Sequence, residues 1–247
     1  MDARNGSVAV IGAGDFIGSA IARRFAREGY LVVAGRRSAD KLEKLKNTIA
    51  EEGGRCLVRG LDARKEDEVA AFLKAADEAA PLEACIINPG ANVNFPILET
   101  TERVFRKVWE MACYSGFLAG REAARLMLPR GRGTILFTGA TASVRGGVGY
   151  AAFASAKFGL RALAQSMARE LGPKNIHVAH LVIDAGVDTA FVRERIRARG
   201  GEDAVEGLAA DQLMNPESIA NAYWFLHTQS RDGWTFELDI RPFMEKW

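Results

Sequence analysis

The stretch GGVGYAAFASAKFGL, residues 146–160, holds a tyrosine and a lysine at a spacing that suits proton transfer. Tyr150, Phe153 and Lys157 occupy positions i, i+3 and i+7, which lie on one face of a helix. A neighbouring ammonium favours the phenolate form of a tyrosine, so this pattern makes Tyr150 a candidate proton donor. The alternative, that Tyr150 only packs at the start of the helix, stays open at this point.

A second group of residues is suited to binding phosphate. In VAVIGAGDFIGSAIA, Gly12, Gly14 and Gly18 stand between an apolar run and a helical pattern. Glycine permits a tight turn and a close approach of the backbone to a pyrophosphate, and the N-terminus of the following helix attracts anions. The order strand, turn, helix favours a dinucleotide site over a plain tight turn.

The end of the second predicted strand indicates which dinucleotide binds. A site that prefers NAD usually has an acidic residue there, whereas AGRR places Gly35 and Arg36 at this point. A guanidinium can bind a 2′-phosphate through two hydrogen bonds, so we expect NADP, with NAD possible. Asp15 in the glycine loop opposes this mildly, because its carboxylate would face the phosphates. A solvated arginine pair is the alternative.

Apolar runs alternate with helical patterns along the chain, which predicts strands that alternate with helices. The expected strands are 7–11, 30–34, 55–61, 83–88, 133–139, 176–183 and 234–240, and the expected helices are 17–29, 38–54 (with Ser38 as N-cap), 65–79, 101–127, 150–171 and 216–228. Several strands are apolar on both faces, as a sheet covered on both sides requires. We expect an α/β fold: a single-domain Rossmann fold over 1–247, with a doubly wound seven-stranded parallel sheet and helices on both faces. The strandless segment at about 186–214 is predicted to be a helical substrate lid.

Composition and motif content limit the other functions. The 247 residues carry a net charge of only +2, which gives no electrostatic case for nucleic acid or an anionic membrane. The three cysteines lack metal-ligand spacing, and His177 and His180 point to opposite faces of a predicted strand, so no metal site is expected. No signal peptide and no apolar run of about 18 residues is seen, so we expect a cytoplasmic protein without a membrane partner.

The glycine loop resembles that of the short-chain dehydrogenase/reductase family, and the resemblance covers nearly the whole chain. Gly12, Ile17 and Gly18 match the family's first-loop motif, while Ile11 and Phe16 replace its threonine and middle glycine. The resemblance implies further cofactor-binding positions. Asp62 would bind adenine, with Ala63 beside it, and Asn88 and Gly90 follow the fourth strand. Thr189 would hold the nicotinamide carboxamide, Val187 suits the position before it in the motif, and Lys157 would hold the nicotinamide ribose. The expected cofactor-binding residues are Gly12, Gly14, Asp15, Ile17, Gly18, Arg36, Asp62, Ala63, Asn88, Gly90, Lys157, Val187 and Thr189.

The same resemblance places unusual residues at the family's catalytic positions. Lys157 matches the catalytic lysine, and this puts Phe153 at the tyrosine, Ala140 at the serine and Ala112 at the asparagine. Loss of a general acid typically costs about 10²–10⁴ in rate, although a cofactor can still bind. Tyr150 is then the candidate acid. Its spacing from Lys157 also resembles that of the enoyl-acyl-carrier-protein reductases. The other candidate hydroxyls for a substrate are those of Thr138, Thr141 and Ser143.

The expected function is an atypical NADP-preferring short-chain oxidoreductase that acts on a small carbonyl, alcohol or activated alkene, with Tyr150 and Lys157 in the catalytic site. The alternative is a catalytically silent NAD(P)-binding sensor or regulatory protein on the same fold. The family usually forms dimers or tetramers, so a homodimer or homotetramer is expected. The basic run RERIRARG, residues 193–200, is expected to be a solvated face of the lid, and contact with an acidic substrate is the alternative.

Overall fold

The seven strands form one sheet in the computed structural model, which describes residues 4–245. The strand order is β3-β2-β1-β4-β5-β6-β7, and every neighbouring pair is parallel. The strands are β1 (Ser7–Ile11), β2 (Leu31–Arg36), β3 (Arg55–Gly60), β4 (Leu82–Ile87), β5 (Gly133–Thr138), β6 (Ile176–Ile183) and β7 (Glu237–Ile240). The chain order reverses between β1 and β4, and ligands of such sheets bind at this point, beyond the carboxyl ends of the strands. The predicted doubly wound parallel sheet is confirmed.

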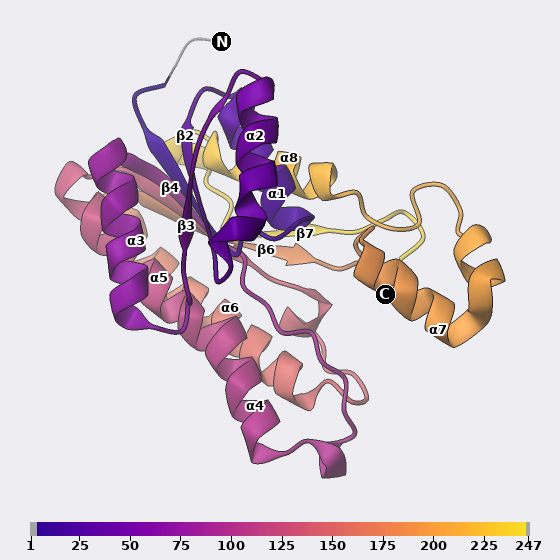
Figure 1. Cartoon of the computed structure of the whole chain (residues 1–247). Helices are drawn as coiled ribbons and strands as arrows, with labels where there is room; N and C mark the ends of the chain where they lie inside the picture. Colours follow the sequence, from indigo (N-terminus) through magenta and orange to yellow (C-terminus); the bar gives the residue numbers. More distant parts are fainter. Residues whose placement is uncertain (1–3, 246–247) are drawn as a thin grey trace.

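Helices cover both faces of the sheet (Figure 1). One layer holds α1 (Ile17–Arg27), α2 (Glu43–Glu51) and α8 (Pro216–His227), and the other holds α3 (Glu66–Ala79), α5 (Ser115–Met127) and α6 (Ala151–Leu171). Successive side chains of a strand point to opposite faces. Accordingly, Val8 and Val10 of β1 pack in the core under the first layer, and Ala9 and Ile11 pack under the second.

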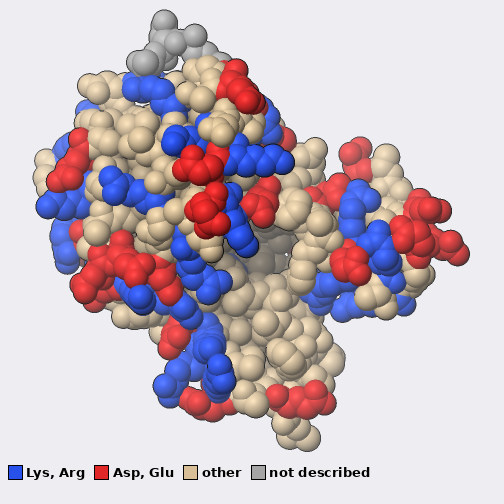
Figure 2. Space-filling view, in the orientation of Figure 1, with Lys and Arg blue, Asp and Glu red and all other residues tan. Residues whose placement is uncertain are grey.

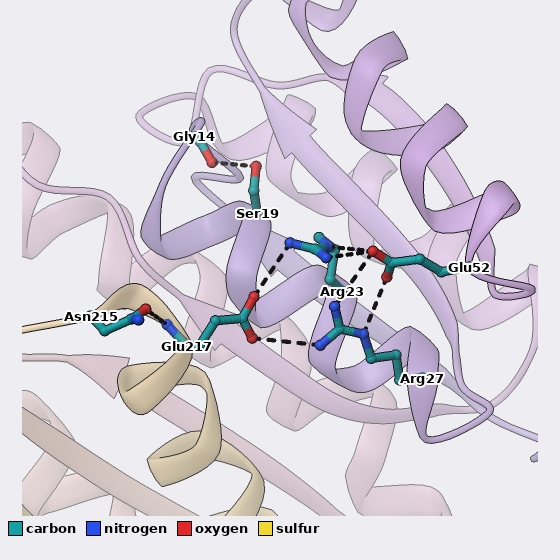
Figure 3. Close-up of polar contacts among 7 residues, drawn as sticks. All are labelled: Gly14, Ser19, Arg23, Arg27, Glu52, Asn215 and Glu217. Atoms are coloured by element: carbon teal, nitrogen blue, oxygen red, sulfur yellow. Dashed lines mark hydrogen bonds and ion pairs between the residues drawn. The ribbon is translucent and has the colours of Figure 1, made fainter. Parts of the chain in front are cut away.

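Two arginines of α1 tie this helix to α2 and α8 (Figure 3). Arg23 Nε lies 2.9 Å from Glu52 Oε1, and Arg27 Nε lies 3.2 Å from Glu52 Oε2. Both guanidinium groups also approach Glu217 at the start of α8, at 3.3 and 3.7 Å. The hydrogen bond from Arg23 lowers the pKa of the Glu52 carboxyl. These ion pairs link α1 to the end of α2 and the start of α8, and the N-terminus of α1 follows the glycine loop.

The segment after β2 differs from its prediction. A single helix was expected over 38–54 with Ser38 as its cap, but a 3₁₀ turn (η1, Ala39–Leu42) precedes α2, and the Ser38 side chain makes no capping hydrogen bond. Strand β2 also runs two residues further than expected. Gly35 and Arg36 continue the parallel register opposite Arg59 and Gly60, because backbone pairing does not require apolar side chains.

The helical region expected over 101–127 is divided in the structure. It consists of α4 (Glu102–Trp109), a π-helical turn (η3, Glu110–Tyr114) and α5. Ala112 lies in the π-helical turn and is buried. Such turns inside α-helices occur frequently at functional sites.

The segment after β6 forms α7 (Ala190–Glu206), which projects from the body of the molecule (Figure 1). Gly201 has φ 76°, so the helix is broken there. An isolated bridge between Val187 and Met214 joins the two ends of the segment. No helix in the described part of the chain combines the length and the apolar character that a bilayer crossing needs.

Candidate active site

A cavity of about 500 Å³ lies beyond the carboxyl ends of β1, β2 and β4, and we call it the glycine-loop cavity. This is the edge of the sheet where the chain order reverses. The cavity brings together seven of the residues predicted to bind a cofactor: Gly12, Gly14, Arg36, Asp62, Ala63, Asn88 and Gly90. Residues that are up to 78 positions apart in the sequence therefore line one space.

The loop after β1 requires glycine at two positions for different reasons. Gly12 has φ +81°, and a Cβ there would lie 3.0 Å from the backbone nitrogen of Pro89. A Cβ on Gly18 would lie 2.5 Å from the Cα of Ala13, so only glycine lets α1 pack this closely on the loop. In contrast, a Cβ on Gly14 would meet nothing within 4 Å and would occupy the cavity.

Side chains hold the backbone of this loop in place. Asn88 Nδ2 donates a hydrogen bond of 3.0 Å to the Gly12 carbonyl. Ser19 Oγ donates one of 2.8 Å to the Gly14 carbonyl (Figure 3). The N-terminus of α1 has no side-chain cap, and its first turn contains no acidic residue. The Ser19 amide of this turn donates to the Gly14 carbonyl at 2.9 Å, and the positive dipole end of the helix is available to an anion.

The part of the cavity next to β2 is basic. Arg36 lines it as predicted, and the structure adds Arg37, Ser38 and Lys41, which the sequence analysis missed. The signal was present in the run RRSADK, but the 3₁₀ turn that contains Lys41 was not expected. Arg36 Nη1 forms an ion pair of 2.7 Å with Asp15 Oδ1, and the Asp15 side chain is largely exposed.

The Asp62 side chain is held in place by Arg64, two residues later in the sequence. Arg64 donates to both carboxylate oxygens, with Nε at 2.9 Å from Oδ1 and Nη2 at 2.6 Å from Oδ2. The hydrogen bonds from Arg64 lower the pKa of the Asp62 carboxyl to about 2. It is therefore a charged hydrogen-bond acceptor at the wall of the cavity at any physiological pH.

The remaining predicted cofactor residues do not line the glycine-loop cavity: Asp15, Ile17, Gly18, Lys157, Val187 and Thr189. Val187 and Thr189 have structural roles in the segment that contains α7. Thr189 Oγ1 accepts a hydrogen bond of 3.1 Å from the Val192 amide and caps α7, and Val187 forms the bridge to Met214.

A second cavity of about 540 Å³ is bounded by the carboxyl ends of β5 and β6, by the first turn of α6 and by α7. We call it the α7 cavity. Figure 2 shows the surface hollowed where the lobe formed by α7 meets the body. Apolar side chains form part of its wall: Ala140, Phe153, Ile183, Ala185, Val192 and Ile196.

Tyr150 and Phe153 both line the α7 cavity. Tyr150 precedes the first residue of α6 and has φ −104° and ψ 17°, so it is outside the regular helix. Its hydroxyl accepts a hydrogen bond of 3.2 Å from Arg195 Nη2 of α7. The Phe153 ring is buried. The cationic partner of the Tyr150 hydroxyl is thus Arg195, while the sequence spacing pointed to Lys157.

Lys157 lies deeper than the two aromatic residues. Its side chain is buried, and Nζ donates a hydrogen bond of 2.8 Å to the carbonyl of Thr138 at the end of β5. Nζ is 5.7 Å from the centre of the Phe153 ring. Burial lowers the pKa of the Lys157 ammonium to about 8. Lys157 is not among the residues that line either cavity, and its contact with a cofactor stays a prediction.

The three hydroxyls near Ala140 hydrogen-bond within the protein. Thr138 Oγ1 lies 2.6 Å from the Tyr223 hydroxyl, and Thr141 Oγ1 donates to Asp184 Oδ1 at 2.6 Å. Ser143 Oγ accepts from the Ala140 amide at 3.1 Å and is fully buried. These bonds fix the loop after β5, and only Thr141 of the three lines the α7 cavity.

Residues 7–200 match the family model described as short chain dehydrogenase. The chain belongs to the short-chain dehydrogenase family. The family predicted from the glycine loop is therefore confirmed, and the match includes β1 to β6 and most of α7. The absence of the family's catalytic tyrosine, serine and asparagine at Phe153, Ala140 and Ala112 stays a prediction.

Known proteins similar to this short-chain dehydrogenase agree with the fold. A crystal structure of a short-chain dehydrogenase from Rhodopseudomonas palustris is 60% identical, covers 97% of this chain and 100% of its own, and has a TM-score of 0.83. An alcohol dehydrogenase from the archaeon Thermococcus sibiricus, complexed with 5-hydroxy-NADP, is 26% identical, with 98% of each chain covered and a TM-score of 0.83. The 3-oxoacyl-[acyl-carrier-protein] reductase MabA of Mycobacterium bovis is 28% identical over 226 residues, which is 90% of this chain and 85% of that protein.

Proposed function

We propose that this short-chain dehydrogenase is an NADP-preferring oxidoreductase that acts on a small carbonyl, alcohol or activated alkene through an atypical catalytic site. The observation that carries the cofactor choice is the basic end of the glycine-loop cavity, formed by Arg36, Arg37, Ser38 and Lys41. An NAD site has a carboxylate at this end of β2. The alcohol dehydrogenase of Thermococcus sibiricus, solved with an NADP analogue, supports the proposal.

The residues of the glycine-loop cavity fit a dinucleotide phosphate. The turn at Gly12 and the N-terminus of α1 would bind the pyrophosphate, and Arg36 would bind the 2′-phosphate. Asp62 and Ala63 would contact adenine. When bound, NADPH supplies the hydride.

Further predicted cofactor residues are retained in the proposal. Asn88 and Gly90 would contact the cofactor beside the turn, and Lys157, Val187 and Thr189 would hold its nicotinamide half. The Lys157 ammonium has three N–H donors, and the Thr138 carbonyl uses one of them in the structure.

Tyr150 is the proposed general acid, because it lines the α7 cavity beside Phe153 and carries a hydroxyl. A hydroxyl has one donor hydrogen and two acceptor lone pairs. Arg195 occupies one lone pair, so the O–H remains free to donate to a substrate oxygen. The positive charge of Arg195 would stabilise the phenolate that this transfer leaves.

The segment at about 186–214 is proposed to be the lid over this site, within one NAD(P)-binding domain over residues 1–247. Its helix α7 forms one wall of the α7 cavity, and Val187 and Met214 join its ends. A homodimer or homotetramer stays a prediction from the family.

Titration with NADPH and NADH tests the cofactor choice. We expect NADPH to bind more tightly, and Arg36→Ala to weaken NADPH binding by roughly tenfold to a hundredfold, as the loss of a charged hydrogen bond does. NADH binding should change little. Arg59→Ala, which removes an exposed arginine of β3 outside the cavity lining, is the matched control. Equal affinity of the wild type for the two dinucleotides would contradict the proposal.

A catalytically silent cofactor-binding protein is the second candidate. It is favoured by the apolar ring of Phe153 in the cavity wall and by the hydrogen bond that directs Lys157 to the Thr138 carbonyl. This candidate predicts saturable NADPH binding without turnover of any carbonyl, alcohol or activated alkene. A screen of hydride transfer over such compounds separates the two candidates.

A further inference from the structure

The basic run of α7 is divided between two faces of the helix. Arg193 Nε pairs with Asp188 at 2.6 Å. Arg197 pairs with Glu194 at 2.6 Å and with Glu202 at 2.5 Å. Both arginines are therefore neutralised by carboxylates of their own segment. Both side chains are also partly exposed to solvent, which agrees with the predicted solvated face.

Arg195 and Arg199 are on the opposite face and line the α7 cavity together with Val192 and Ile196. The four positions are spaced i, i+3, i+4 and i+7, which is one stripe of a helix. Within residues 4–245, no carboxylate oxygen lies within 4.0 Å of either arginine. Arg195 contacts the Tyr150 hydroxyl and the face of the Phe191 ring. Arg195 is half-buried, so the predicted solvated face does not hold at this residue, whereas Arg199 is exposed and agrees with it.

The rest of the cavity wall, as far as residues 4–245 form it, adds one arginine and one carboxylate. Arg145 is the third arginine of the lining, and it lies 3.1 Å from Asp184 and 3.5 Å from Glu245. Glu245 is the one carboxylate of the lining among the described residues. The space next to Arg195 and Arg199 therefore combines two guanidinium groups with an apolar wall.

We propose that Arg195 and Arg199 bind an anionic group of the substrate, a carboxylate or a phosphate. This inference rests on the proposed function, because it names the substrate class of the same site. Guanidinium groups bind both anions through paired N–H donors, and the cavity volume of about 540 Å³ is within the range of small-molecule sites.

The geometry also relates the anion to the proposed proton donor. Arg195 has five N–H donors, and one of them is used by Tyr150. An anion bound to the remaining donors and the Tyr150 hydroxyl would contact the same Arg195 guanidinium, so the two would lie close together. The substrate class that fits is a small oxo-acid or oxo-phosphate, with the reacting carbonyl and the anion at opposite ends of a short skeleton.

Paired compounds test this proposal with NADPH. The carboxylate arm compares 4-oxopentanoate with 4-oxopentanamide, and the phosphate arm compares dihydroxyacetone phosphate with dihydroxyacetone. We expect a preference in kcat/KM of about tenfold or more for the anion in one arm. Arg199→Ala should remove the preference by raising KM for the anion more than for its neutral partner. Arg197→Ala, on the solvated face of the same helix, is the matched control.

Calorimetric titration of the same two anions separates this inference from the proposed function, because it needs no turnover. Binding of one anion to the wild type, weakened about tenfold or more in Arg199→Ala and unchanged in Arg197→Ala, supports the anion site even in a protein without hydride transfer. The absence of binding by both anions, or equal binding in Arg199→Ala, overturns the inference. Turnover of the neutral ketones in that case leaves the proposed function intact.

Discussion

Arg195 Nη2 lies 3.2 Å from the hydroxyl of Tyr150, so a residue of α7 contacts the residue at the start of α6 across the α7 cavity. The two residues are 45 positions apart in the sequence. This contact orients the Tyr150 hydroxyl, and it joins the proposed proton donor to the proposed anion site. Movement of α7 would therefore change the position of the Tyr150 hydroxyl and the geometry of the anion site at the same time.

Two glycines of the loop after β1 are expected to respond differently to alanine. In Gly18→Ala, the new Cβ would lie within 2.6 Å of backbone atoms of Gly12 and Ala13, which cannot move as a side chain can. We expect the free energy of unfolding to fall by about 3 kcal/mol, the upper end of the usual cost of overpacking. Urea unfolding measures this change.

Gly14→Ala is the matched control, because its Cβ meets nothing within 4 Å. We expect its unfolding free energy to stay within about 0.5 kcal/mol of the wild type. Its methyl group would occupy the glycine-loop cavity and weaken NADPH binding roughly tenfold, or about 1.4 kcal/mol. Equal stability of the two variants would show that the close approach at Gly18 is not required.

In the proposed cofactor site, Asp15 would compete with the 2′-phosphate for Arg36. Its largely exposed carboxylate forms an ion pair with Arg36 Nη1, and such exposed pairs are worth about 0.2–1 kcal/mol. Asp15→Asn should therefore tighten NADPH binding up to about fivefold, since it releases Arg36 and removes a charge beside the phosphates. The gain should shrink as salt is added. Asp232→Asn, in the turn before β7, controls for the loss of one negative charge, and weaker NADPH binding by Asp15→Asn would count against this account.

Lys157 should make stability depend on pH in the alkaline range. Burial lowers the pKa of its ammonium from 10.5 to about 8. Between these values, the unfolded chain holds a proton that the folded chain has released, so the free energy of unfolding rises with pH. Relative to that of Lys157→Met, the free energy of unfolding of the wild type should rise by roughly 3 kcal/mol from about pH 8 to about pH 10.5. Urea unfolding over this range measures the difference, and a difference that stays constant with pH would contradict the burial of a titrating lysine.

The fold was predictable because its signals are local. Apolar runs marked all seven strands, and glycine marked the turn after β1. The predicted bounds of strands and helices are wrong where strand pairing or local backbone geometry determines the structure. Gly35 and Arg36 extend β2 through their register with β3, and the π-helical turn that contains Ala112 has no signature in the sequence.

The candidate site was predictable only in part, because its chemistry depends on contacts between distant segments. Seven predicted cofactor residues meet in the glycine-loop cavity. Helical spacing placed Tyr150 and Phe153 together, but it could not show that Tyr150 would face Arg195 or that Lys157 would face the Thr138 carbonyl. The division of the basic run of α7 became visible only once the cavity beside one of its faces was defined.

Turnover by the wild type and by Tyr150→Phe tests the central claim most directly. The measurement is kcat for NADPH oxidation with the best carbonyl substrate from the screen, together with the Kd for NADPH. The account predicts a loss of about 10²–10⁴ in kcat, as removal of a general acid typically gives, with the Kd for NADPH unchanged. Equal kcat in the two proteins would contradict the role of Tyr150, and no turnover in the wild type would favour the silent cofactor-binding protein.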